Sequence, residues 1–433
     1  MSLRTFGCLS LVLTLAACAV PSADDTSSSE SGFTSDKATL LDFAFDGEVL
    51  APAGSSPEAA IQNQLYYSVG ALNGRNSVGR LDAVKITDVR AEPEGARTRI
   101  RYHAVLPVGW GAKYGLPTAY TLELPRDVSQ QGLRAFLSKY GATCIDLWSA
   151  HDVSIGNYWY YYRTDARGCA LDPADAVKIP VTITRSDDNR DGTYPEYDRI
   201  WADGLLHAIV IFGKDRAGAS GFTDFGVSAY GQFNVKLRMY QAGLKLTPSP
   251  ADIPGAPGTD FPDVTWEGSF PDGRKVKVNA LLVDSLGAYN PAFDARYAEL
   301  SSTADLIIYN GHAAFGDNVR ALTRKGRFVT GQYTIVSMMG CDSFAYVDGY
   351  MAQERARLNA DDPNGTRYLD MITNVTPANP TWFPQEAANM IQMLGDVARP
   401  STYQQILRTF DPKHIAVVTG DADNTYRPAP PSP

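Results

Sequence analysis

The chain has 433 residues, of which 44% are hydrophobic and 20% are charged, and its formal net charge is −9 at pH 7. This length and apolar content are sufficient for two domains with buried cores. The negative charge argues against nucleic acid and anionic membrane surfaces as partners, because both repel an acidic protein.

The first residues are typical of an export signal. Arg4 precedes an apolar stretch from Phe6 to Ala17 that is too short to span a bilayer. The stretch ends in Leu-Ala-Ala-Cys, which resembles a bacterial lipobox with Cys18 as the lipid-modified residue. The alternative is an ordinary signal peptide that contains a cysteine. We therefore expect residues 1–18 to be a lipoprotein signal peptide. The lipid anchor would be the protein's one attachment to the membrane, in the bacterial cell envelope, at the outer membrane or the cell surface.

Residues 19–39 are rich in Ser and Asp, which predicts a disordered tether. Residues 40–185 then predict a smaller α+β domain, with a sheet that carries helices on one side. Helical spacing is found in two segments, 58–72 and 129–141. Strand patterns are found in four segments, 80–89, 96–108, 118–125 and 157–163.

Residues 186–425 alternate between apolar strand patterns and helix patterns. The expected strands cover six segments, 205–213, 276–283, 305–310, 332–339, 367–375 and 414–420. Buried-type strands with helices between them predict an α/β domain: a six-stranded, mostly parallel sheet with helices on both faces. The Pro-rich residues 426–433 predict a disordered tail.

The cysteines divide by position. Cys144 and Cys169 lie close in sequence and are predicted to form a disulfide, since an exported protein meets an oxidising compartment. Cys341 then remains without a partner. It is either a small buried hydrophobic residue or a reactive thiol in a loop, and its place after a strand end beside Gly340 favours the loop.

A histidine and this cysteine follow two of the predicted strands. "DLIIYNGHAAFG" places His312 after one strand, and "YTIVSMMGCDSF" places Cys341 after the next. The chemistry of parallel sheets lies beyond the carboxyl ends of the strands, so both residues are expected at one edge. The alternative for His312 is a polar residue that hydrogen-bonds to the backbone at a strand end.

These two stretches resemble the caspase–gingipain–legumain clan of cysteine peptidases, in which a histidine follows the third strand and a cysteine follows the fourth. The six-strand pattern agrees, so the resemblance covers roughly half of the chain. It implies that Cys341 is the nucleophile and His312 the general acid/base that protonates the leaving amine. It also implies an oxyanion hole formed by the Cys341 N–H and the turn at His312 and Ala313. Gly311 and Gly340 would allow close approach of the backbone.

One position departs from the clan, because glycine usually follows its histidine and Ala313 stands here. The leading hypothesis is a surface-anchored cysteine endopeptidase that acts on a protein or peptide. The alternative is an inactive relative with the same fold that serves as a surface binding or adhesion protein. Lys214, Asp215 and Arg216 weakly resemble the clan's first specificity loop, and their mixed charge allows either an acidic or a basic preference.

Residues 187–198, "DDNRDGTYPEYD", resemble a calcium-binding loop. Asp187, Asn189 and Asp191 supply oxygen atoms at its first, third and fifth positions, and Asp198 supplies a carboxylate at the twelfth. The expected cofactor is therefore Ca²⁺, and the alternative is an acidic turn between domains that binds no metal. The aromatic run 158–162 predicts the core of a strand, with a stacking surface for carbohydrate or peptide as the alternative.

Overall fold

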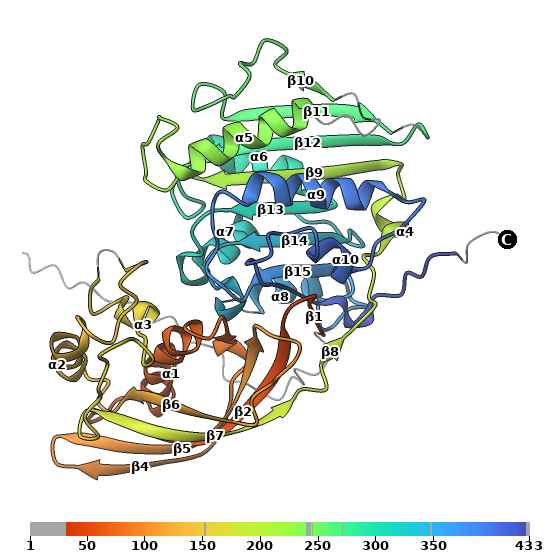
Figure 1. Cartoon of the computed structure of the whole chain (residues 1–433). Coiled ribbons are helices and arrows are strands. Elements are labelled where there is room, and N and C mark those ends of the chain that lie inside the picture. The colour runs from red at the N-terminus through yellow and green to blue at the C-terminus, as the bar shows by residue number, and fades with distance from the viewer. Residues whose placement is uncertain are drawn as a thin grey trace, which may run out of the picture.

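The structure is a computed structural model that describes residues 32–150, 153–239, 244, 246–270, 272–346 and 349–429. The predicted signal peptide, the lipobox with Cys18 and the first part of the predicted tether lie outside these residues. Two β-sheets organise the described chain, one built mainly from the first half and the other mainly from the second half (Figure 1). No helix in this part of the chain is long and apolar enough to cross a membrane.

The larger sheet is mixed and has ten strands, in the order β10-β11-β12-β9-β13-β14-β15-β16-β1-β8. Its five central strands are parallel: β12 (Lys275–Val283), β9 (Leu205–Gly213), β13 (Leu306–Asn310), β14 (Thr334–Met339) and β15 (Leu369–Asn374). The outer strands are β10 (Thr247–Ser249), β11 (Asp263–Ser269), β16 (Ala416–Thr419), β1 (Phe33–Thr34) and β8 (Asn189–Arg190). The predicted α/β class is confirmed, but the predicted count of six strands is too low, because three of the added strands have only two or three residues and show no periodicity.

Helices cover both faces of this sheet. Along β9, alternate residues enter two different cores, since Ala208 and Val210 pack on one face while Ile209 and Ile211 pack on the other. The first face is covered by α5 (Phe225–Met239), α9 (Phe383–Gly395) and α10 (Tyr403–Leu407). The second is covered by α6 (Pro291–Ser301), α7 (Asp317–Lys325) and α8 (Tyr350–Leu358). A short α4 (Tyr197–Ile200) leads into β9.

The smaller sheet is antiparallel. Its main path runs through β3 (Val78–Gly79), β5 (Arg97–Trp110), β2 (Thr39–Pro52), β7 (Ala176–Arg185) and β6 (Ala119–Pro125), and β4 (Lys85–Glu94) also pairs with β5. Buried and exposed residues alternate along β7, so one face of the sheet meets the core. Three helices, α1 (Pro57–Asn73), α2 (Gln130–Tyr140) and α3 (Tyr158–Tyr161), lie on one side of it (Figure 1).

The prediction of a strand over residues 157–163 is wrong, because residues 158–161 form the short helix α3. Tertiary contacts override the strand propensity of the aromatic run. Gly70 of α1 allows the backbone of α3 to approach closely, since a Cβ atom at Gly70 would lie 2.3 Å from the Trp159 carbonyl oxygen. The buried Arg163 guanidinium donates to the carbonyl oxygens of Tyr160 and Tyr162 and so satisfies the end of the helix.

Two predicted disordered segments contain ordered residues. The tether prediction is wrong for residues 32–39, because β1 pairs with β16 and β8, and Phe33 is buried against the ring of Phe344. The tail prediction is wrong for Tyr426, whose ring packs on Tyr197 and whose N–H donates to Glu196. Composition could not show that these ends add contacts to the larger unit.

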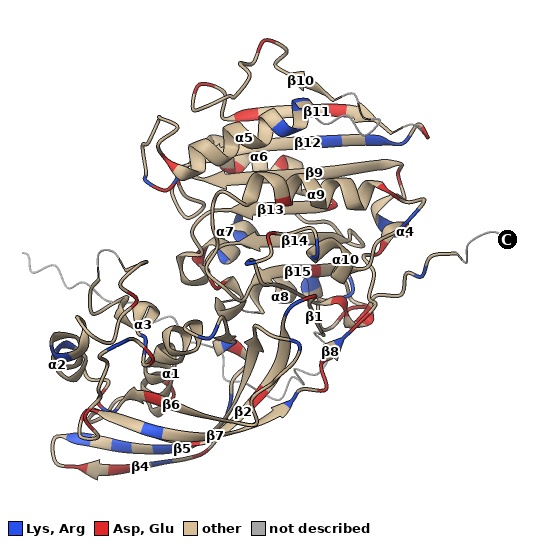
Figure 2. Cartoon of the chain, viewed as in Figure 1, with Lys and Arg blue, Asp and Glu red and all other residues tan. Residues whose placement is uncertain are grey.

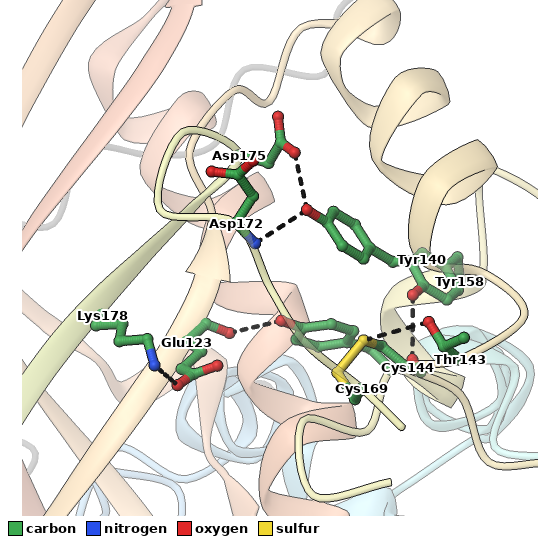
Figure 3. The surroundings of a disulfide bond; sticks show 10 residues. Glu123, Tyr140, Thr143, Cys144, Tyr158, Cys169, Asp172, Asp175 and Lys178 are labelled. Carbon is green, nitrogen blue, oxygen red and sulfur yellow. Dashed lines mark hydrogen bonds and ion pairs between the residues drawn. A yellow bond between two sulfur atoms is a disulfide. The ribbon is translucent and has the colours of Figure 1, made fainter. Parts of the chain in front are cut away.

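The predicted disulfide between Cys144 and Cys169 is confirmed. Figure 3 shows it beside a group of tyrosines, where Tyr158 donates to the Cys144 carbonyl oxygen at 3.1 Å and Tyr162 donates to the Glu123 carbonyl oxygen at 2.9 Å. The bond therefore ties the loop after α2 to the segment before β7 within one buried cluster.

Reduction of this disulfide is expected to lower the free energy of unfolding by about 3 kcal/mol, because the two cysteines lie 25 positions apart and the bond limits the entropy of the unfolded chain. Urea unfolding with and without a reductant measures the difference. A Cys341→Ser variant is the matched control and should keep the full effect of the reductant. Equal stability of the oxidised and reduced protein would contradict the prediction.

Candidate active site

The strands that precede His312 and Cys341 are neighbours and end at the same level. In the parallel pair β13 and β14, Asn310 lies opposite Met339. The Gly311 N–H donates to the Met339 carbonyl oxygen at 3.3 Å, which continues the pairing past the ends of both strands. His312 and Cys341 each come two residues after this last pair. The predicted placement of both at one edge of the sheet is therefore what the backbone shows.

The turns that carry these residues are in contact. A Cβ atom at Gly340 would lie 2.9 Å from both the Cα and the N atoms of Ala313, so only glycine allows this approach. Gly311 is similarly close to the end of β9, where its Cβ atom would lie 3.3 Å from the Gly213 Cα atom. The two glycines of the predicted site thus allow the ends of β9, β13 and β14 to approach one another closely.

Ala313, which departs from the clan, adopts a right-handed conformation (φ −68°, ψ −29°) that suits alanine. The left-handed conformations fall on its successors Ala314 (φ 48°) and Phe315 (φ 50°), in the 3₁₀ helix η3 (Ala314–Gly316), and on Asp342 (φ 49°) after the cysteine. Non-glycine residues with such backbone angles are strained, and strain of this kind clusters at functional sites.

Cys341 is half-buried and is the free cysteine of the described chain. Its Sγ atom lies 3.9 Å from the Ala378 carbonyl oxygen. Burial raises the pKa of the thiol to about 11, and the negative charge of Asp342 adds to the increase. The thiol is therefore protonated at neutral pH in this conformation.

Asp342 is fully buried and links the site to the other unit. Its Oδ2 atom accepts hydrogen bonds from the Asn73 amide at 2.6 Å and from the Tyr160 hydroxyl at 2.8 Å. Asn73 ends α1 and Tyr160 belongs to α3, so the N-terminal unit closes over the cysteine turn. None of these three residues was predicted as part of the site, although Tyr160 lies within the aromatic run for which a stacking surface was an alternative.

His312 is exposed and faces the loop after β9. Its Nε2 atom lies 3.2 Å from the Asp215 carbonyl oxygen and 3.4 Å from the Asp215 Oδ1 atom. Asp224 holds that loop in place, because its carboxylate accepts the N–H groups of Asp215 and Arg216. Within the described chain, no hydrogen bond joins His312 to Cys341.

The other two charged residues of the predicted specificity loop, Lys214 and Arg216, differ in their surroundings. Lys214 forms an ion pair with Asp284, with the Nζ and Oδ1 atoms 2.7 Å apart. Arg216 lines a surface hollow of about 350 Å³ formed by residues 216–221, 223 and 224. The loop therefore presents one arginine beside a hollow, next to the histidine.

The residues of the predicted calcium loop are spread over several roles. Asn189 lies in β8, where its side chain exchanges hydrogen bonds with the backbone of Leu40. Asp191 accepts a hydrogen bond from Gln404, and Asp198 lies in α4. Among the residues that the structure describes, no group of three or more His, Cys, Asp or Glu side chains is arranged to hold a metal ion. Ca²⁺ binding by Asp187, Asn189, Asp191 and Asp198 stays a prediction.

Comparisons of the chain with protein-family models, with curated proteins and with solved structures found no match.

Proposed function

We propose that the protein is a cysteine endopeptidase of the caspase–gingipain–legumain type, with Cys341 as the nucleophile and His312 as the general acid/base. The observation that carries the proposal is the level ending of β13 and β14, with the turns of the two residues in contact at Gly340 and Ala313. His312 would take the thiol proton as the sulfur attacks a peptide carbonyl and would pass it to the leaving amine as the C–N bond breaks. Water would then hydrolyse the resulting thioester and free the thiol.

Asp215 supports this assignment of roles. Its carboxylate and carbonyl oxygens both lie near the Nε2 atom of His312, so they hold this nitrogen and fix the direction of the ring. The other ring nitrogen is then the one that would serve the substrate. We propose the hollow beside Arg216 as the place for the side chain that precedes the cleaved bond.

The resting site would be latent in this conformation. The thiol is protonated, and Tyr160 and Asn73 hold the cysteine turn from the other unit. A movement of the N-terminal unit that frees Asp342 would expose Cys341. The proposal includes a lipid anchor at Cys18 and a place at the bacterial cell surface, where the substrate would be a protein or peptide.

A second candidate function is a surface binding protein without catalytic activity. The raised pKa of the Cys341 thiol favours it, because a nucleophilic cysteine ordinarily has a lowered pKa. The half-exposed ring of Phe315, packed on Trp159 beside the two turns, would supply an apolar contact for such a partner.

Cleavage of a peptide library is expected to fall by about 10²–10⁴-fold in a His312→Ala variant, the usual contribution of a general acid/base, and to vanish in Cys341→Ala. The pH profile of Cys341 alkylation by iodoacetamide should also change in His312→Ala. His103→Ala is the matched control, because His103 is paired with Asp46 in the smaller sheet, away from the cysteine turn. The binding protein would be supported instead if the wild type left the library intact and if the alkylation profile were the same in wild type and His312→Ala.

A further inference from the structure

A second cluster of buried polar groups lies at the other end of the parallel strands. Asp370 is the second residue of β15, whereas β14 beside it and β13 beyond that carry no charged residue (Figure 2). It is fully buried, and its Oδ2 atom accepts hydrogen bonds from the hydroxyls of Tyr333 and Tyr403 and from the amide of Asn424. Its Oδ1 atom has no hydrogen-bond partner among the described residues.

Two further side-chain oxygen atoms in this cluster also have no hydrogen-bond partner among the described residues. Asp421 begins the 3₁₀ helix η5 (Asp421–Asp423) directly after β16, and it is fully buried. Its Oδ2 atom accepts from the Thr193 hydroxyl at 2.5 Å, while its Oδ1 atom has no partner in the described chain. Asn424 donates its amide to Asp370 and to the Tyr194 carbonyl oxygen, and its own Oδ1 atom has no partner there either.

These groups are neighbours. Gly420 precedes Asp421 and packs on the backbone of β15, since a Cβ atom at Gly420 would lie 3.4 Å from the Asp370 Cα atom. No Lys, Arg or His of the described ranges forms an ion pair with either carboxylate. Two buried acids that form no ion pair are costly to ionise.

We propose that Asp370, Asp421 and Asn424 form a site for a hard divalent cation, and that this cation is Ca²⁺. The three partnerless oxygens are two carboxylates and one amide, which are ligand types that calcium prefers, and water or backbone carbonyl groups would complete its coordination. The set differs from the four predicted ligands of the loop of residues 187–198. That loop contributes two hydrogen bonds here, one from Thr193 to Asp421 and one from Asn424 to the Tyr194 carbonyl oxygen. Two of its three ligands are carboxylates and the third is an amide, so the set is not one of the groups of three His, Cys, Asp or Glu side chains considered above.

A cation here would join the last strand to the sheet. It would link β15 to the segment after β16, and through Asn424 and Thr193 to the segment that connects the two units. The proposal is independent of any peptidase activity, since the cluster lies at the amino ends of the parallel strands and His312 and Cys341 lie past their carboxyl ends.

The test is thermal unfolding of the full chain, stripped with EDTA, against increasing CaCl₂, with calorimetric titration of Ca²⁺ for the stoichiometry. At a concentration of about 100 times the dissociation constant, the melting temperature should rise by about 3 °C, with one ion bound per chain. Asp421→Asn should lose both the shift and the binding. Asn is close in shape and removes a buried charge, so this variant is expected to fold, and its far-UV circular dichroism checks that.

Two control variants separate the proposal from its rivals. Asp423→Asn changes an exposed neighbour in the same 3₁₀ helix and should keep the calcium shift. Asp191→Asn changes the loop of residues 187–198 and should keep it as well. An unchanged melting temperature in CaCl₂, a wild-type shift in Asp421→Asn, or a shift lost only in Asp191→Asn would each overturn the proposal.

Discussion

Replacing His414 with alanine is expected to lower the free energy of unfolding by about 3–5 kcal/mol, because it leaves the buried carboxylate of Glu386 without its partner. The His414 side chain is fully buried, and only 2% of the Glu386 side chain is exposed. Urea unfolding followed by tryptophan fluorescence measures the loss.

Both ring nitrogens of His414 face oxygen acceptors. The Asn374 amide donates to the Gly340 carbonyl oxygen at 3.0 Å, so its Oδ1 atom is the one that faces His414 Nε2, at 2.7 Å. The other ring nitrogen, Nδ1, lies 2.9 and 2.8 Å from the two Glu386 oxygens. The His414 ring is therefore held from both sides, by Asn374 and by Glu386. The rings of Trp382 and Phe410 stack against it and add to its stabilisation.

A double-mutant cycle tests this explanation. Glu386→Ala should also be strongly destabilising, because it leaves the buried His414 ring without its carboxylate partner. The double variant should be less destabilised than the sum of the two single variants. Additive losses would show that the two residues act by packing alone. Ser302→Ala, a change of a hydroxyl at the surface, is the control for a substitution outside the network.

The same network reaches the candidate active site. Gly340, whose carbonyl oxygen accepts from Asn374, immediately precedes Cys341. The position of the cysteine turn thus depends on a buried ion pair that comes from α9 and the segment before β16. Nothing in the sequence around Cys341 indicates this support, because Glu386 and His414 lie far along the chain.

The main elements of the fold were predictable because each carries its own periodic pattern. The apolar run of β9 and the helix after Ser129, which the Ser129 side chain caps, need no information from elsewhere in the chain. The edge strands were not predictable, since β1 and β8 have two residues each and exist only through their neighbours. Helix α3 was missed for a related reason, because contacts with Gly70 and Arg163 decide its conformation.

The candidate site also has one part that the sequence predicts and another that it does not. The positions of His312 and Cys341 follow from where two strands end, so the sequence was sufficient to predict them. Their surroundings depend on long-range contacts: Asp342 is 269 positions from Asn73 and 182 positions from Tyr160. Asp215 was predicted as part of a specificity loop, and only the three-dimensional structure shows that it contacts His312.

Asp342→Asn is expected to stabilise the protein at pH 8 by about 4 kcal/mol and to have little effect near pH 4. Burial raises the pKa of Asp342 from its ordinary value of 3.8 to about 7. A carboxyl with a raised pKa contributes stability that is fully present below the unfolded pKa and is lost as the pH rises through the folded pKa. The wild type should therefore lose stability between about pH 4 and pH 7, and the variant should not.

Urea unfolding of both proteins at pH 5 and pH 8 measures this difference. Asparagine keeps an oxygen that can accept from Asn73 and Tyr160, and it cannot ionise. Asp260→Asn, at an exposed position, is the matched control and should leave the wild-type pH dependence unchanged. The same slope of stability against pH in wild type and Asp342→Asn would contradict the assignment of the effect to this residue.

The same substitution should change the chemistry of the neighbouring thiol. The charge of Asp342 is the largest contribution after burial to the raised pKa of Cys341, so its removal should lower that pKa below the wild-type value of about 11. Alkylation of Cys341 by iodoacetamide should then begin at a lower pH in Asp342→Asn. Because Tyr160 and Asn73 hold Asp342 from the N-terminal unit, the junction between the two units would control both the stability of the protein and the reactivity of its cysteine.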